Sequence, residues 1–151
     1  MLRTEGVDGI KERRESIMNR TRFLVDTDII INYLKGREIA RDFLLRIIDE
    51  SVSGFFSVIT EAELLSGSRN ADDDAVIYSI LDCMEAIEVE RNIAVTAGKL
   101  RQKYYAAYRT ELPDAIIAAT ANEYELILAT ANEKHFNMFT EIETEYIKDN
   151  F

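Results

Sequence analysis

Short apolar segments alternate with helical segments along most of this chain, and this alternation limits the fold more than any other feature. Four segments are apolar runs of the kind that fill buried strands: residues 23–25, 55–59, 87–89 and 126–129. The segments between them repeat apolar residues every three or four positions, as amphipathic helices do: 29–34, 38–50, 72–84, 92–108 and 113–124. A weak further strand is expected near Ile142. Such alternation predicts an α/β fold with a parallel, twisted sheet of about four to five strands and helices on both faces.

The composition is that of one globular domain. A chain of 151 residues is long enough for a single hydrophobic core, and 47% apolar with 30% charged residues argues against disorder. One cysteine and one histidine exclude an internal disulfide, a cysteine-rich metal cage and a site with several histidines. No apolar run approaches the roughly 20 residues of a spanning helix. We therefore expect a cytoplasmic protein with no membrane partner.

Residues 1–21 differ from the rest of the chain, since they are polar and only weakly helical. We expect an N-terminal extension over 1–21 and one α/β domain over 22–151. Met18 lies a few residues before the first strand, so translation from Met18 is an alternative. If translation starts at Met18, residues 1–17 are a misassigned start. If it starts at Met1, they form an arm that packs on the domain.

Oxygen-bearing side chains follow the predicted strands. Asp26 closes the first strand, and Asn132 lies just past the strand at 126–130. Glu63 and Asp114 lie at the starts of helices, Glu63 in the first turn of a helix capped by Thr60. Because the carboxyl ends of parallel strands meet at one edge of a sheet, these side chains are expected to lie together. Oxygen ligands suit a hard cation, so the pattern predicts a Mg²⁺ or Mn²⁺ site.

Each of these residues also has a purely structural interpretation. Asp26 could cap the helix that follows it, and Asp114 could be an ordinary acid in a first helical turn. Glu63 falls three residues after Thr60, where a capping-box glutamate stands. Asn132 could be a turn residue. The four together favour the metal site.

Neighbouring polar residues could support the site. Thr27 and Thr130 could donate hydrogen bonds to its carboxylates or bond only to nearby backbone. Asp28 is favoured as the cap of the helix after the first strand. His135 is favoured as a loop residue over a general base.

Four short motifs carry a resemblance to a known family. They read Phe-Leu-Val-Asp-Thr-Asp at 23–28, Ser-Val-Ile-Thr-Glu-Ala-Glu-Leu-Leu-Ser-Gly at 57–67, Leu-Pro-Asp-Ala-Ile-Ile-Ala-Ala-Thr-Ala at 112–121, and Leu-Ala-Thr-Ala-Asn-Glu-Lys-His-Phe at 128–136. From Phe23 to about Phe139 the chain resembles the PIN-domain ribonucleases, especially the VapC-like toxins of toxin–antitoxin pairs. The resemblance implies a three-layer PIN-like fold and identifies 22–151 as a nuclease domain.

The resemblance also implies a catalytic set. Asp26, Glu63 and Asp114 match the metal-binding acids of the family, and Asn132 stands at its fourth acidic position. Asn132 departs from the family because an amide contributes no charge. Asp28 is a second departure, because the family often has Asn or Ser there, and it could restore the missing charge.

The activity implied is that of a Mg²⁺- or Mn²⁺-dependent endoribonuclease, a hydrolase of RNA phosphodiesters. The resemblance further implies a homodimer and a cognate antitoxin that fills the site. The net charge of −10 disfavours a general nucleic-acid binder, so RNA would be held by local basic side chains. The candidates for this role are Lys35, Arg37, Lys99, Arg101 and Lys103.

Two other functions fit parts of the sequence. Asp26 and Asp28 form the D-x-D of a haloacid-dehalogenase-type phosphatase, although that family prefers glycine where Ile29 stands. A catalytically weak or inactive PIN fold, kept as an interaction module, is the other alternative, and Asn132 is the residue that makes it possible.

Overall fold

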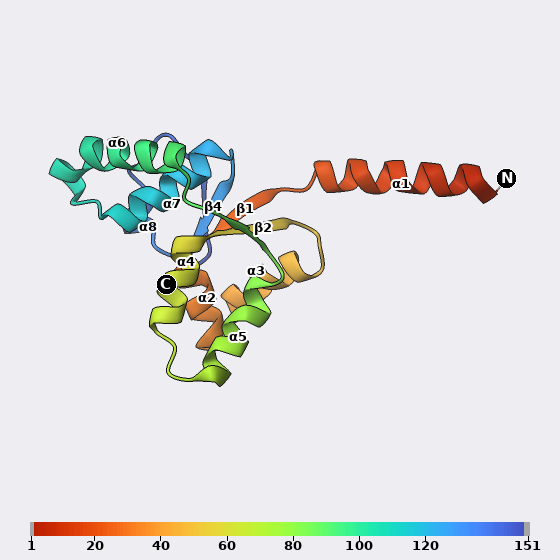
Figure 1. The fold of residues 1–151 in the computed structure, drawn as a ribbon, viewed down its shortest axis with the longest axis horizontal. Coiled ribbons are helices and arrows are strands. Elements are labelled where there is room, and N and C mark those ends of the chain that lie inside the picture. Colours follow the sequence, from red (N-terminus) through yellow and green to blue (C-terminus); the bar gives the residue numbers. More distant parts are fainter. Residues whose placement is uncertain (1, 150–151) are drawn as a thin grey trace.

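The predicted parallel sheet is confirmed. The computed structural model describes residues 2–149, and its centre is a five-stranded sheet in the order β3-β2-β1-β4-β5 (Figure 1). All four pairings between neighbouring strands are parallel. The strands are β1 (Arg22–Val25), β2 (Ser53–Ser57), β3 (Glu85–Ile87), β4 (Ile127–Thr130) and β5 (Thr144–Tyr146). β1 lies in the middle, where Phe23 is aligned with Gly54 of β2 and with Ile127 of β4.

Helices cover both faces of the sheet, which gives the expected three layers. The helices are α1 (Leu2–Met18), α2 (Thr27–Leu34), α3 (Glu38–Ile48), α4 (Val58–Ser66), α5 (Ala71–Leu81), α6 (Arg91–Tyr108), α7 (Leu112–Glu123) and α8 (Glu133–Phe136). One buried cluster joins the sheet to α6, α7 and α8, and a second joins it to α2, α3, α4 and α5. Figure 1 shows these two groups on opposite sides of the strands.

Alternation along β1 assigns its side chains to the two clusters. Leu24 packs toward α6 and α7, whereas Phe23 and Val25 pack toward α2 and α3. A side chain at Gly54 would have no room, because a Cβ there would lie 2.9 Å from atoms of Ile47 and Met84. The absence of a side chain at this position lets α3 and the turn that follows α5 pack closely over β2.

The element boundaries correct the sequence-based prediction at β2. The strand ends at Ser57 rather than at Ile59, because the Ser57 hydroxyl accepts a hydrogen bond from the Ile59 amide and starts α4 there. Thr60 is therefore not the cap, and Glu63 is in the second helical turn, outside any capping box. The β-branched run at 58–59 resembles a strand, but the serine cap decides the local structure.

Other differences are smaller. β3 lies two residues earlier than predicted, and the weak strand expected near Ile142 is β5. α8 was not predicted, because four residues are too few to show a helical period.

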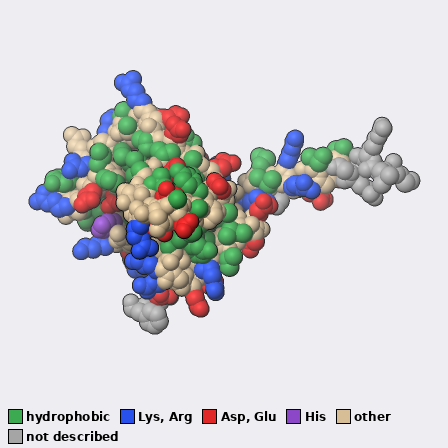
Figure 2. Space-filling view, turned by 60° about the horizontal axis from the view of Figure 1, so that its bottom comes forward, with side chains coloured by type: hydrophobic (Ala, Val, Ile, Leu, Met, Phe, Trp, Pro, Cys, Tyr) green, Lys and Arg blue, Asp and Glu red, His purple; other side chains and the backbone are tan. Residues whose placement is uncertain are grey.

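α1 extends away from the rest of the molecule as a straight helix (Figures 1 and 2). It makes no extensive contact with the other elements among the described residues, and Val7, Ile10 and Met18 on it are exposed. Within residues 2–149, no helix combines the length and the apolar character that crossing a membrane requires.

Candidate active site

The turn from β1 into α2 carries the central carboxylate. Asp26 is buried and is the N-cap of α2, where its Oδ1 accepts a hydrogen bond from the Thr27 amide at 2.9 Å. Its Oδ2 accepts a second hydrogen bond from the Thr130 hydroxyl at 2.9 Å. Capping uses only one carboxyl oxygen, so a structural role and a role in the site coexist at this residue.

Asp28 connects the start of α2 to the end of β4. It lies in the first turn of α2 and does not cap the helix, which corrects the prediction that it is the N-cap. Asp26 takes that role because the chain leaves the strand at Val25 and enters the helix at Thr27. Asp28 Oδ2 accepts from the Ala131 amide at 3.1 Å and lies 3.3 Å from the Thr130 hydroxyl.

Thr27 joins Asp26 to Glu63 on α4. The Thr27 hydroxyl donates to Glu63 Oε1 at 3.0 Å and lies 3.3 Å from the hydroxyl of Thr60. Thr27 and Thr130 thus both contact candidate site carboxylates. Glu63 has no capping duty in α4, which removes its structural alternative.

Asp114 comes from the first turn of α7 and meets a residue that the sequence analysis assigned to a loop. Asp114 Oδ2 lies 3.1 Å from Nδ1 of His135, and His135 is on the short helix α8 rather than in a loop. The proximity was not visible in the sequence, because it depends on α8 forming directly beyond β4. His135 lies only five residues after β4, at the sheet edge where ligand sites gather. A predicted helix at this position would have made His135 a candidate site residue.

The carboxylates influence one another. Burial, together with the negative charge of Asp28 and to a smaller extent that of Asp114, raises the pKa of Asp26 to about 7, against hydrogen bonds from Thr130 and Thr27 that lower it. Burial also raises the pKa of Asp28, against its hydrogen bonds to Ala131 and Thr130. These two carboxyls therefore lie where negative charge is costly.

The same holds for Asp114. Burial raises the pKa of Asp114, and the charges of Glu111 and Glu63 add to the effect, whereas His135 opposes it. Asp26, Asp28, Glu63 and Asp114 therefore share one electrostatic environment. A positive charge placed among them would relieve this repulsion.

The donor set fits a hard divalent cation in its chemistry, since all of its side chains offer oxygen. In the part of the chain that the structure describes, no three acidic, histidine or cysteine side chains converge closely enough to enclose a metal ion. Mg²⁺ is usually held by only one or two carboxylates, with water completing its shell.

Asn132 lies next to this group without joining it through its side chain. It stands at the N-cap of α8, but its side chain does not cap the helix. Its backbone amide donates to the Thr130 hydroxyl at 3.0 Å. Thr130 therefore connects Asn132, Asp26 and Asp28 at the end of β4.

The candidate RNA-binding residues are spread over the molecule. Lys35 lies at the end of α2 in a groove of about 510 Å³ that Glu63 also lines, and Arg37 precedes α3. On α6, Lys103 pairs with Glu141 at 3.3 Å, and the guanidinium of Arg101 lies 4.4 Å from the ring centre of Tyr105.

The cavity beside Asp114 has other basic residues. Its volume is about 210 Å³, and Arg109, Lys134 and His135 line it, whereas Lys99, Arg101 and Lys103 do not. The sequence predicts RNA contacts in the middle of α6 because the basic residues there are close together along the chain. The fold instead brings the end of α6 and the helix α8 to the site.

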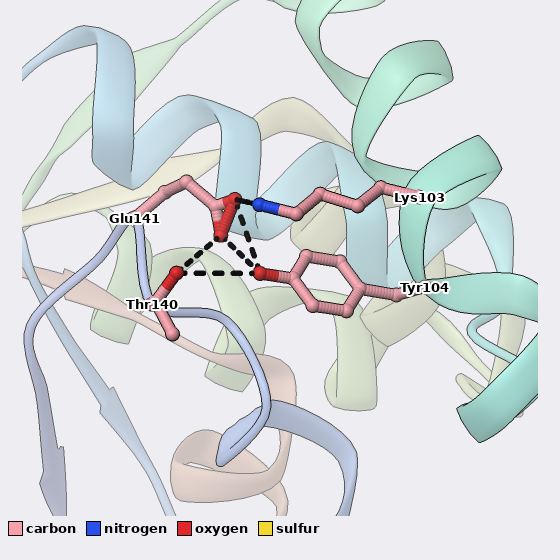
Figure 3. A network of polar contacts seen from close by, with 4 residues as sticks. All are labelled: Lys103, Tyr104, Thr140 and Glu141. Atoms are coloured by element: carbon pink, nitrogen blue, oxygen red, sulfur yellow. Dashed lines mark hydrogen bonds and ion pairs between the residues drawn. The ribbon is translucent and has the colours of Figure 1, made fainter.

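A polar network fixes the loop that follows α8 (Figure 3). The Tyr104 hydroxyl on α6 donates to Glu141 Oε1 at 2.5 Å, and the Lys103 ammonium donates to Oε2 of the same carboxyl group at 3.3 Å. Burial raises the pKa of Glu141, but the hydrogen bonds from Tyr104, its own backbone and Lys103 outweigh it and leave the pKa lowered. The network therefore holds an ionised Glu141 and ties the loop around Thr140 to α6.

Comparison with known proteins assigns the chain to a family. The family model of the PIN domain matches residues 23–141, which include all the carboxylates described above. The chain is a PIN-domain protein. The match favours this assignment over the haloacid-dehalogenase alternative.

Individual PIN-domain relatives support the family. The chain is 36% identical over 120 residues to Ribonuclease VapC10 of Mycobacterium tuberculosis, covering 79% of this chain and 89% of that protein. It is similar to a chain of a toxin–antitoxin complex from Klebsiella pneumoniae, with 31% identity, a TM-score of 0.67, and coverage of 85% of this chain and 99% of that one. A chain of VapBC2 from Rickettsia felis, 20% identical with a TM-score of 0.74 over 85% of this chain and all of that one, shows the same fold.

Proposed function

We propose that this PIN-domain protein is a metal-dependent endoribonuclease and the toxin of a toxin–antitoxin pair. Relatives named as VapC ribonucleases support the activity. The observation that carries the proposal is the repulsion within one group of carboxylates, which contributes to a pKa of about 7 at Asp26. Four acids gathered at one sheet edge favour a divalent cation and, through it, a phosphate. We also propose that it acts in the cytoplasm.

Each residue then has a role. Asp26 and Asp114 would hold Mg²⁺ or Mn²⁺, and Glu63 and Asn132 would complete its shell through side chain or water. Thr27 keeps Glu63 in place through its hydrogen bond of 3.0 Å. When bound, the cation offsets negative charge on the phosphate during in-line displacement.

Asp28 would supply the charge that Asn132 lacks. Its carboxylate accepts a hydrogen bond from the amide of Ala131, the residue directly before Asn132. The Thr130 hydroxyl lies within hydrogen-bond distance of both Asp28 and Asp26. This arrangement puts a carboxylate next to the fourth acidic position of the family.

The test is cleavage of a mixed pool of structured RNA with MgCl₂ or MnCl₂. Asp26→Asn and Asp114→Asn should each lower the rate by at least about 100-fold, because each removes a charged ligand. Asp72→Asn, at an exposed acid at the start of α5, is the matched control and should cut at the wild-type rate. Cleavage that persists in both site variants or without metal would refute the proposal. RNA left intact and no metal bound by the wild type would favour the inactive interaction module.

The role of Asp28 is tested in the same assay. Asp28→Asn should reduce cleavage by about 10- to 100-fold, as loss of a supporting carboxylate commonly does. Asn132→Asp added to that variant should restore activity, because it returns the charge to the same edge. A double variant no better than Asp28→Asn would show that Asp28 acts otherwise.

The partner proposal rests on the relatives, since the Klebsiella pneumoniae structure is a toxin–antitoxin complex. We propose a cognate antitoxin for this chain and a homodimer in its absence. Light scattering during size-exclusion chromatography of the purified chain should give twice the mass of 17.3 kDa. A mass of one chain over a broad concentration range would contradict the homodimer.

A further inference from the structure

A second feature of the carboxylate edge is the cavity of about 210 Å³ next to Asp114. One wall is the end of α6 and the connection to α7, with Tyr108, Arg109 and Thr110. The opposite wall is α8, with Lys134 and His135. The cavity therefore lies between two segments that are separated by more than twenty residues in sequence.

Its basic side chains are available to a ligand. Within residues 2–149, neither Arg109 nor Lys134 forms an ion pair with a carboxylate. By contrast, Lys103, which also lies on α6, forms an ion pair with Glu141. Arg109 has a left-handed backbone with φ of 56°, and its guanidinium lies 5.2 Å from the ring centre of Tyr105. This contact holds the group in place, which lowers the entropy lost on binding.

Two further side chains of the first wall, Thr110 and Tyr108, are open to contact with a ligand. The Thr110 side chain is buried, and its hydroxyl has no hydrogen-bond partner among the described residues. A buried hydroxyl left alone is uncommon and costly, and Thr110 lines the cavity, so a hydrogen bond to a ligand there would offset this cost. Tyr108 is 55% exposed and lines the cavity, where its ring offers a face for stacking.

The mixture of charges indicates the kind of ligand. Besides the basic residues, the carboxylates of Glu111 and Asp114 line the cavity, so a bare anion would be poorly held. A nucleotide combines a phosphate for Arg109 and Lys134 with a base for Tyr108 and with N–H and O–H donors for Glu111. The cavity is smaller than the roughly 300–1,000 Å³ of common small-molecule pockets, so it suits one unit of a longer chain.

We infer that the cavity between α6 and α8 is a subsite for one nucleotide of the RNA, next to the phosphate that is cut. This inference rests on the proposed ribonuclease function and adds to it the residues that grip the substrate. Arg109 and Lys134 bind its phosphate and Tyr108 stacks on its base. These residues replace the basic residues on the middle of α6 as the RNA contacts nearest the carboxylates.

The test measures binding without turnover. The ¹⁵N-labelled full chain is titrated with the four nucleoside 5′-monophosphates in buffer with MgCl₂, since these probes contain no phosphodiester to cut. Amide shifts should concentrate in residues 108–112, 114 and 133–138. Arg109→Gln and Tyr108→Leu should each weaken binding by about tenfold, the value of one charge-assisted hydrogen bond or one stacked base. Arg91→Gln, at the far end of α6, is the matched control and should bind as the wild type does.

The outcomes separate this inference from the proposed function. Nucleotide binding at these amides by a chain that cuts no RNA would keep the subsite and refute the ribonuclease. RNA cleavage with an unchanged KM in Arg109→Gln would refute the subsite alone. The subsite is also refuted if inorganic phosphate shifts the same amides with the same affinity, because the nucleotide part would then contribute nothing.

Discussion

Asp26 combines two roles that conflict energetically. Its Oδ1 caps α2, and its Oδ2 accepts from Thr130, yet burial and the neighbouring Asp28 make its negative charge costly. The folded chain therefore binds a proton at Asp26 more tightly than the unfolded chain does. A cation that binds at this position would favour the ionised form that the folded chain alone disfavours.

This conflict predicts a pH dependence for the metal-free protein. The pKa of Asp26 is about 7 in the folded chain against 3.8 in the absence of its surroundings. Between these values only the folded chain keeps the proton, so the free energy of unfolding falls as pH rises from about 4 to about 7. The raised pKa values of Asp28 and Asp114 act in the same direction.

Asp26→Asn removes the titrating group. The variant should be more stable than the wild type at pH 8 by on the order of 2 to 4 kcal/mol, with little difference at pH 4. Urea unfolding in EDTA at both pH values measures this, with Asp72→Asn as the exposed control. A less stable Asp26→Asn at pH 8 would mean that hydrogen bonds to the ionised carboxylate outweigh its burial.

At the scale of elements, the wall of the cavity depends on how the loop after α8 is anchored. That loop is held to α6 by the contacts of Glu141 with Tyr104 and Lys103 (Figure 3). Phe139 also packs edge-on against the Tyr104 ring at 5.1 Å. The ring of Tyr104 is therefore part of the core, whereas its hydroxyl anchors the loop through Glu141.

Tyr104→Phe separates the two contributions, because it keeps the ring and removes the hydroxyl. We expect a loss of about 1–3 kcal/mol in the free energy of unfolding, since a half-buried carboxylate loses a donor. Hydrogen exchange of the amides in 133–141 should become faster. The control is Tyr108→Phe on the same helix, whose exposed side chain should contribute little. If Tyr104→Phe loses no more stability than Tyr108→Phe and exchange in 133–141 is unchanged, the hydroxyl of Tyr104 does not anchor the loop.

The boundaries of the elements also show where the sequence-based prediction differs from the structure. Asp26 and Asp114 were placed correctly at a strand end and a helix start, because capping and proline are local features. The prediction for Glu63 is wrong by one helical turn. Ser57 and Thr60 can each cap a helix, and the structure shows that Ser57 is the cap. The difference matters, because Glu63 is then free to accept from Thr27.

For the whole molecule, we propose that residues 22–151 form the PIN domain and that 1–21 is an extension. The family model begins at residue 23, and α1 stands apart from the domain (Figure 1). Described side chains on α1, such as Ile10 and Ile17, are exposed and contribute little to a core.

Removal of residues 1–18 should therefore leave the stability of the domain almost unchanged. The midpoint of thermal unfolding should change by less than roughly 2 °C, as for surface changes in a domain of this size. For comparison, Phe23→Ala at the centre of the sheet should cost about 3–5 kcal/mol. A large fall in the midpoint on truncation would show that the extension packs on the domain in solution.

The sequence by itself determined the alternation of strands and helices, the parallel sheet and the acids at its carboxyl edge. These follow from local periodicity, from caps and from the rule that parallel strands end at one edge. Only the tertiary structure decided that His135 meets Asp114, that Thr130 joins Asp26 to Asp28, and that the end of α6 faces α8. Such contacts join residues far apart in sequence. They depend on strand register and helix packing, which local preferences do not specify.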